Sequence, residues 1–235
     1  MHQCARFCSK PKCLHEKAVK DIVRYLWSTK DRGLILKPNG TFVLDAYCDS
    51  DFAGLWHREY AHLRESVLSR TGYVITLGGA PIHWVSKLQT EIALSTTEAE
   101  YIALSTCARE LLPLRAILTE IIKHGPVDHD VDKYREATKS TLTTRHMSSS
   151  RRSAKIAPSI VYEDNAGCIV IATEPDQNRP RTKHIGIKYH HFRDQVRLGH
   201  LKVTKIPTAL NWADIFTKPL VHTKFVALRK MLMGW

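Results

Sequence analysis

The middle of the sequence contains a predicted β-hairpin, which limits the kinds of sheet that this chain can build. The apolar runs YVITL (73–77) and IHWVS (82–86) flank GGAP (78–81), a cluster of turn-forming residues. A further strand is predicted over TFVLDAYCD (41–49), where apolar residues alternate loosely. The first three strands are therefore expected to be antiparallel.

Helices and strands alternate after the hairpin. A long helix is predicted from about Ser95 to about Lys123, with a kink or break at Pro113. The elements that follow are a strand at 159–164, a short helix at 165–172, a basic helix at 183–196, a strand at 200–206, a helix at 211–218 and a last amphipathic helix that runs to Trp235. This order predicts an α/β fold.

Two segments differ from this α/β part. Residues 15–38 contain a predicted amphipathic helix, whose apolar stripe includes Ile22, Leu26 and Trp27 and which ends before Gly33. Residues 125–158 are rich in Ser, Thr, Asp, Lys and Arg and poor in large apolar side chains, so we interpret them as a disordered insertion.

The net charge of +12 favours an acidic partner such as nucleic acid, although basic charge can also serve solubility alone. The charge is unevenly distributed, because residues 41–124 hold 10 acidic and 7 basic side chains whereas the flanking segments are basic. An acidic centre between basic flanks suits a cation site beside a polyanion track.

Three features concern the compartment. The sequence has no run of 18 or more apolar residues, so no membrane span is expected. The N-terminal segment lacks the apolar region of a secretory signal. The six cysteines are scattered, which is typical of reduced thiols. The chain is therefore expected to be intracellular and not secreted.

Four acidic residues lie at the ends of predicted strands or among apolar residues. Asp49 closes the first strand, Asp164 closes the strand at 159–164, Glu100 lies in the long helix and Asp214 in the helix at 211–218. Because strand carboxyl ends line the binding crevice of an α/β sheet, Asp49 and Asp164 could project into one site. Each acid alone is explained as well by a cap or a solvated face, but clustered carboxylates repel one another unless cations neutralise them. Mg²⁺ prefers such oxygen ligands.

Glu98 competes with Glu100 for the position in this group. Two residues apart on a helix, their side chains point about 200° away from each other, so only one can face the sheet. Glu100 shares its row with Ala103, Leu104 and Leu111, and Glu98 has a more mixed neighbourhood. We therefore expect Glu100 to face the sheet.

The order and spacing of six motifs resemble the ribonuclease H domain of copia-type retrotransposon polyproteins. The motifs are CDSDFAG (48–54), SRTGYVITLGGAPIHWVSKLQT (69–90), ALSTTEAEYIALS (93–105), YEDNAG (162–167), RTKHIGIKYHHFRD (181–194) and NWADIFTKPL (211–220). The resemblance covers nearly all of residues 41–220. Residues 1–40 resemble a remnant of the connection to a reverse transcriptase, and 221–235 the family's C-terminal helix.

The resemblance implies a ribonuclease H-like fold, a five-stranded mixed sheet with the first three strands antiparallel and helices on both faces. It also implies that the catalytic, metal-binding carboxylates are Asp49, Glu100, Asp164 and Asp214. These would hold two Mg²⁺ ions, for which Mn²⁺ can substitute, and cut the RNA strand of an RNA–DNA hybrid. The implied partner is the reverse transcriptase domain of the parent polyprotein, in a cytoplasmic virus-like particle or the nucleus, with no membrane.

A basic segment is the candidate nucleic-acid contact. Its residues could follow the phosphates of a hybrid, or could simply form a solvated helix face. The candidates are Arg181, Lys183, His184, Lys188 and Arg193, with Asn165 beside Asp164.

Two other functions remain open at this stage. A decayed, catalytically inactive copy could keep only nucleic-acid binding, although all four acids are present. A transposase or integrase nuclease would carry its Glu last in the chain, whereas here Glu100 comes second of the four.

Overall fold

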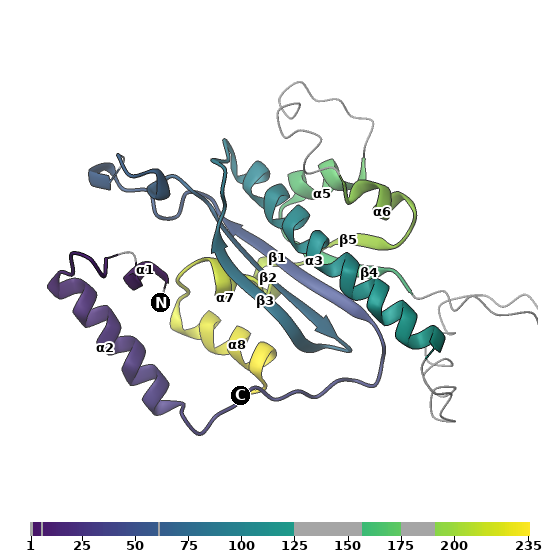
Figure 1. Cartoon of the computed structure of the whole chain (residues 1–235), viewed down its shortest axis with the longest axis horizontal. Coiled ribbons are helices and arrows are strands. Elements are labelled where there is room, and N and C mark those ends of the chain that lie inside the picture. The colour runs from purple at the N-terminus through teal and green to yellow at the C-terminus, as the bar shows by residue number, and fades with distance from the viewer. Residues whose placement is uncertain (1, 6, 61, 125–156, 175–190) are drawn as a thin grey trace, which may run out of the picture. The chain divides into compact units, whose positions relative to one another are not determined.

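The computed structural model describes residues 2–5, 7–60, 62–124, 157–174 and 191–235 (Figure 1). The chain divides into two compact units, Met1–Ile35 and Leu36–Trp235. Residues 125–156 of the predicted insertion at 125–158, and most of the predicted basic helix at 183–196, lie outside the described residues.

The first unit contains α1 (His2–Ala5) and α2 (Cys13–Ser28). The helix predicted in this segment is present but ends earlier than expected. The hydroxyls of Ser28 and Thr29 both donate to the carbonyl of Tyr25, at 2.9 and 2.8 Å, and such local bonds compete with continued helix. Of the predicted apolar stripe, Ile22 is half-buried, whereas Leu26 and Trp27 are exposed, Trp27 with 74% of its surface accessible.

The second unit is built on one five-stranded sheet. Its strands are β1 (Leu44–Asp51), β2 (Arg70–Leu77), β3 (Ala80–Leu88), β4 (Ser159–Glu163) and β5 (Leu201–Lys205). They lie in the order β3-β2-β1-β4-β5, with β1, β2 and β3 antiparallel and with β4 parallel to both β1 and β5. The predicted mixed sheet with three antiparallel strands is confirmed.

Helices lie on both faces of the sheet, as predicted (Figure 1). The helices are α3 (Thr96–His124), α5 (Ala166–Thr173), α6 (Arg193–Arg197), α7 (Asp214–Thr217) and α8 (His222–Met233), with short 3₁₀ turns at Arg58–Tyr60, Arg64–Ser66 and Thr208–Leu210. No helix in the described part of the chain is long and apolar enough to cross a membrane.

Two helix predictions differ from the structure. The predicted break at Pro113 is wrong, because α3 continues through this residue as one helix of 29 residues. The helix predicted at 211–218 begins only at Asp214. Asn211 has extended backbone, and its side-chain oxygen accepts a hydrogen bond from the N–H of Ala213 at 3.2 Å, so the preceding residues form a turn.

The core lies between α3 and one face of the sheet. Side chains of a strand alternate between its faces, and in β1 Ala46 and Cys48 point toward α3 while Tyr47 and Asp49 point to the opposite face. On that opposite face the ring of Tyr47 stacks between Tyr162 and Trp212, with centroid distances of 4.7 and 4.6 Å. The carboxyl ends of β1 and β4 therefore meet at one edge of the sheet, with α3 on one side and α7 on the other.

Candidate metal-binding site at the carboxyl edge of the sheet

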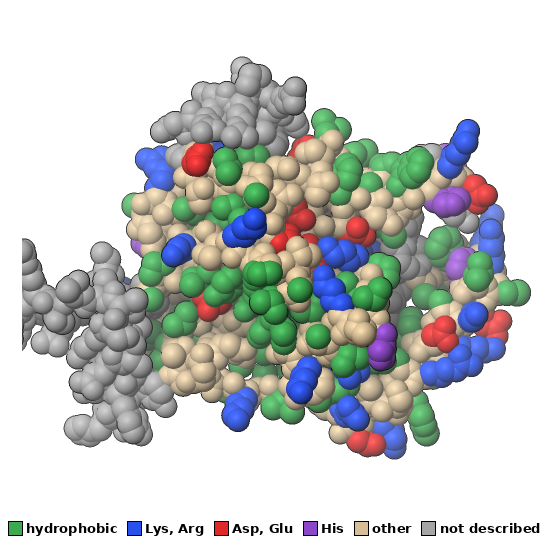
Figure 2. All heavy atoms as spheres, turned by 180° about the vertical axis from the view of Figure 1, so that it is seen from behind, with side chains coloured by type: hydrophobic (Ala, Val, Ile, Leu, Met, Phe, Trp, Pro, Cys, Tyr) green, Lys and Arg blue, Asp and Glu red, His purple; other side chains and the backbone are tan. Residues whose placement is uncertain are grey.

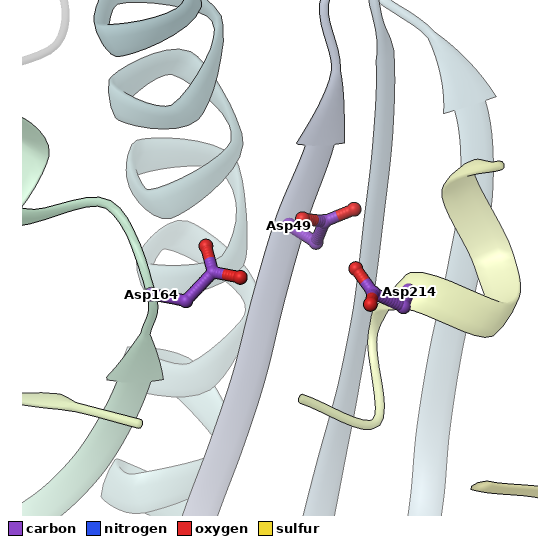
Figure 3. A group of neighbouring side chains, drawn as sticks. All are labelled: Asp49, Asp164 and Asp214. Atoms are coloured by element: carbon purple, nitrogen blue, oxygen red, sulfur yellow. The ribbon is translucent and has the colours of Figure 1, made fainter. Parts of the chain in front are cut away.

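Three aspartates from three separate elements meet at this edge. Asp49 lies in β1, Asp164 directly follows β4, and Asp214 begins α7. One carboxylate oxygen from each lies within 4.8 Å of the others, and Figure 3 shows the side chains of Asp164 and Asp214 directed toward Asp49. Asp49 and Asp214 are buried and Asp164 is half-buried, so solvent reaches the group beside Asp164.

A second group of carboxylates shares Asp164. It consists of Glu100 from α3, Glu163 from the end of β4 and Asp164, again with one oxygen of each within 4.8 Å of the others. The structure thus brings together all four acids named from the sequence and adds Glu163. Asp51, which shares the first motif, is in neither group.

Glu98 has a different place, at the N-terminus of α3. Its side chain accepts a hydrogen bond from the N–H of Leu94 at 2.7 Å, and its own N–H donates to the hydroxyl of Ser95 at 3.2 Å. These contacts satisfy backbone groups that the first turn of a helix leaves without partners. Glu98 is buried but belongs to neither carboxylate group, and Glu100 is the glutamate of α3 that reaches Asp164.

The close approach of α7 to the sheet depends on Gly72. In the antiparallel register Gly72 lies opposite Asp49, and a Cβ at this glycine would stand 2.6 Å from Thr217 Cγ2. Asn211 fixes the chain just before α7, because its buried side-chain amide donates to the carbonyl of Cys48 at 2.9 Å. These contacts place Asp214 next to Asp49.

Two lysines neutralise part of the negative charge. The ammonium of Lys218 lies 2.8 Å from Asp214 Oδ1 and 3.3 Å from Asp49 Oδ1, and Lys224 forms an ion pair with Asp214. The hydroxyl of Thr217 donates to Asp49. In Figure 2 acidic side chains lie near the centre of the view, with Lys and Arg side chains beside them.

Burial dominates the proton affinity of the carboxylates. It raises the pKa of Asp49 to about 7, against the opposing effect of the Lys218 charge. It raises the pKa of Glu163 to about 8, although the N–H of Asn165 stabilises the charged form. Burial, together with the charge of Glu163, raises the pKa of Glu100 to about 10. Burial favours the neutral form of Lys218, but the negative charges and hydrogen bonds of Asp49 and Asp214 together have the larger effect and raise the pKa of Lys218.

This donor set fits a divalent cation of the Mg²⁺ type. All donors are carboxylate oxygens, and the two groups lie close enough to surround small ions. The buried Oε2 of Glu100 has no hydrogen-bond partner within the described residues. A buried oxygen without a donor is costly unless a proton or a cation binds it.

Two plant polyproteins match nearly the whole chain. The retrovirus-related Pol polyprotein from transposon RE1 of Arabidopsis thaliana is 32% identical over 225 residues, which is 96% of this chain and 13% of that polyprotein. The polyprotein from transposon TNT 1-94 of Nicotiana tabacum is 34% identical over 98% of this chain and 14% of its own length. The chain is homologous to one segment of the Pol polyproteins of copia-type retrotransposons.

The chain spans about an eighth of the length of these Pol relatives. No protein-family model matches it. A solved ribonuclease H1 isolated from compost aligns with a TM-score of 0.44 and 18% identity, over 75% of this chain and 94% of that chain.

The predicted nucleic-acid contacts of this Pol segment are only partly described. Arg181, Lys183, His184 and Lys188 lie outside the described residues. Arg193 donates to the carbonyl of Ile171 and lies 5.9 Å from the ring centroid of Tyr101, so its guanidinium joins α6 to α5 and α3. Asn165 caps α5, where its side chain accepts from the N–H of Cys168 at 2.9 Å.

Several site residues were not predicted from the sequence. Asn211 and Lys218 lie inside the motif NWADIFTKPL, and Glu163 inside YEDNAG, so position within a motif was an available signal. Gly72 lies in the predicted hairpin strand, and its role becomes visible only when α7 is placed against β2.

Proposed function

We propose that this segment hydrolyses the RNA strand of RNA–DNA hybrids, with divalent cations held by its carboxylates. The observation that carries this proposal is the convergence of Asp49, Asp164 and Asp214 within 4.8 Å at the carboxyl edge of the sheet. The similarity of the chain to retrovirus-related Pol polyproteins supports it. Mg²⁺ is the proposed cofactor, and Mn²⁺ would substitute for it.

The chain's own residues have separable parts in this chemistry. Asp49, Glu100, Asp164 and Asp214 hold the cations, which when bound supply an activated water and neutralise charge on the phosphate. Thr217, through its hydroxyl, orients the carboxylate of Asp49. The ammonium groups near Asp214 limit repulsion among the acids while the site is being formed.

A polyanionic substrate agrees with the charge of the chain. The net charge is +12, although the carboxylate site itself is acidic, so basic residues elsewhere on the chain are available for phosphates. The proposed partners are the hybrid and the reverse transcriptase domain of the parent polyprotein, of which this chain covers only a part.

The test is cleavage of a labelled RNA–DNA hybrid by the purified chain with Mg²⁺, alongside single-stranded and duplex RNA. We expect cutting of the hybrid alone, abolished by EDTA and by Asp164→Asn. Asp194→Asn is the matched control, because the side chain of Asp194 is 72% exposed and lies in α6, outside both carboxylate groups.

Binding of the hybrid by the wild-type chain without any cutting would contradict hydrolysis and favour the non-catalytic alternative. Asp49→Asn distinguishes hydrolysis from simple binding further, since this substitution should abolish cutting and leave hybrid binding largely intact. Asp49 bonds to Thr217 and Lys218 within the protein, so thermal unfolding of this variant must be compared with wild type.

A further inference from the structure

We propose that three stacked aromatic residues, Tyr47, Tyr162 and Trp212, are positioning residues that set the spacing of the three aspartates of the site. The rings act through the three elements that carry the aspartates, and not by contact with a cation or with the substrate. The inference rests on the proposed function, because it concerns how the chain builds that site, but its test measures cation affinity and not cleavage.

Each ring lies two residues before one of the aspartates. The pairs are Tyr47 with Asp49 in β1, Tyr162 with Asp164 at the end of β4, and Trp212 with Asp214 at the start of α7. Side chains two residues apart in a strand project from the same face, so the ring and the carboxylate of β1 share the α7 side of the sheet. A contact that fixes the rings beside one another therefore also constrains the aspartates that follow them.

The strand register brings the first two rings together. Tyr47 and Tyr162 are partners in the parallel register of β1 and β4, and their ring centroids lie 4.7 Å apart with the ring planes inclined by 25°. Neighbouring strands are about 4.8 Å apart, so the ring stack and the backbone hydrogen bonds favour the same register. A slip of one residue would turn Tyr162 to the other face and move Asp164 away from Asp49.

Trp212 attaches the third element to this pair. Its ring centroid lies 4.6 Å from that of Tyr47, and the two planes are inclined by only 3°. The preceding residue, Asn211, is fixed to the same strand, because its side-chain amide donates to the carbonyl of Cys48 at 2.9 Å. A hydrogen bond and a ring stack therefore hold the chain to β1 directly before Asp214, the first residue of α7.

The helix α7 depends on such contacts. It contains four residues, Asp214–Thr217, and a helix this short is not stable by itself. The three carboxylates also repel one another when no cation is bound. Flat rings stack at a narrow range of separations, whereas an aliphatic side chain in the same place would allow several. Three half-buried rings in series therefore provide the spacing that the carboxylates alone cannot maintain.

The experiment measures the Mn²⁺ affinity of the whole chain, by electron paramagnetic resonance of free Mn²⁺ during titration, together with thermal unfolding. Trp212→Leu removes one end of the stack and should lower Mn²⁺ affinity by at least about tenfold, as is usual when a residue that orients metal ligands is replaced. Trp212→Phe keeps a flat ring and should recover most of the affinity. Tyr162→Leu removes the other end of the stack, should cause a similar loss, and serves as the test if Trp212→Leu does not fold.

Two controls distinguish positioning from a general loss of stability. Trp27→Leu makes the same substitution in the first unit, where the side chain is exposed, and should leave Mn²⁺ affinity unchanged. Leu118→Ala removes a core side chain near the opposite end of α3 from Glu100. It should lower the melting temperature while Mn²⁺ affinity is retained, because the ring stack is intact.

Wild-type Mn²⁺ affinity in both Trp212→Leu and Tyr162→Leu would overturn the inference, and so would an equal loss of affinity in Leu118→Ala. Loss of hybrid binding with Mn²⁺ affinity retained would also overturn it, because the rings would then contact nucleic acid directly. If the wild-type chain binds Mn²⁺ but cuts no hybrid, the proposed function is contradicted. A loss of Mn²⁺ affinity in the ring variants alone would still support the positioning role in that case.

Discussion

Replacement of Gly72 by alanine tests whether the approach of α7 to β2 sets the geometry of the site. The new Cβ would lie 2.6 Å from Thr217 Cγ2, 2.9 Å from Phe216 Cβ and 3.1 Å from the carbonyl oxygen of Ala213. Ordinary contact begins near 3.4 Å, so α7 must move away from the strand by about 0.8 Å. Because Asp214 and Thr217 belong to α7, both would move away from Asp49.

Two quantities follow from this displacement. Overpacking of this kind costs about 1–3 kcal/mol of unfolding free energy, which corresponds to a melting temperature lower by roughly 2–12 °C for a chain of this size. A displacement of about 1 Å in a catalytic group can lower the rate by about 100-fold. We therefore expect a moderate loss of stability and a much larger loss of hybrid cleavage, measured well below the melting temperature.

The assay compares thermal unfolding, Mn²⁺ affinity and hybrid cleavage for wild type, Gly72→Ala and Gly33→Ala. Gly33 is the matched control, because a Cβ there would meet nothing within 4 Å and the residue belongs to the first unit. Wild-type stability and wild-type cleavage in Gly72→Ala would refute the reasoning. Equal losses in both glycine variants would show that the effect is not specific to the contact with α7.

Two further outcomes are expected. Glu98→Gln should lower the unfolding free energy by about 0.5–1 kcal/mol, because the cap on α3 becomes weaker, and should leave Mn²⁺ affinity unchanged. A loss of Mn²⁺ binding as large as that of Glu100→Gln would contradict the assignment of Glu98 as a cap. With EDTA present, stability should fall as pH rises from about 4 toward 10, because folded Asp49, Glu163 and Glu100 keep protons that the unfolded chain releases near pH 4. Each such carboxyl contributes about 1.4 kcal/mol per pH unit, and a melting temperature that rises over this range would show that these groups are ionised in the folded protein.

The sequence was sufficient to predict the sheet and the convergence of the four acids at one place, because both rest largely on local patterns. The turn cluster at 78–81 sets the antiparallel hairpin, and the strand ends at Asp49 and Asp164 determine which side chains reach the carboxyl edge. The helical row of Glu100 was enough to separate it from Glu98.

Local side-chain hydrogen bonds and tertiary packing explain where two helix predictions failed. The end of α2 is set by side-chain bonds of Ser28 and Thr29, since the helix stops well before Gly33. The helix α3 tolerates Pro113 because this residue lies on its exposed side while the neighbouring turns pack against the sheet. In both places the prediction relied on a helix-breaking residue type, and packing or a nearby hydroxyl decided the result.

Glu163 shows why adjacent acids were hard to evaluate from the sequence. Strand alternation sends Glu163 and Asp164 to different directions, so a site confined to one face of the sheet could use only one of them. At this edge, however, α3 covers one face and α7 the other, and each supplies a carboxylate, Glu100 and Asp214. The carboxyl edge therefore gathers acidic side chains from both sides around the end of β4, which no local pattern in the sequence could indicate.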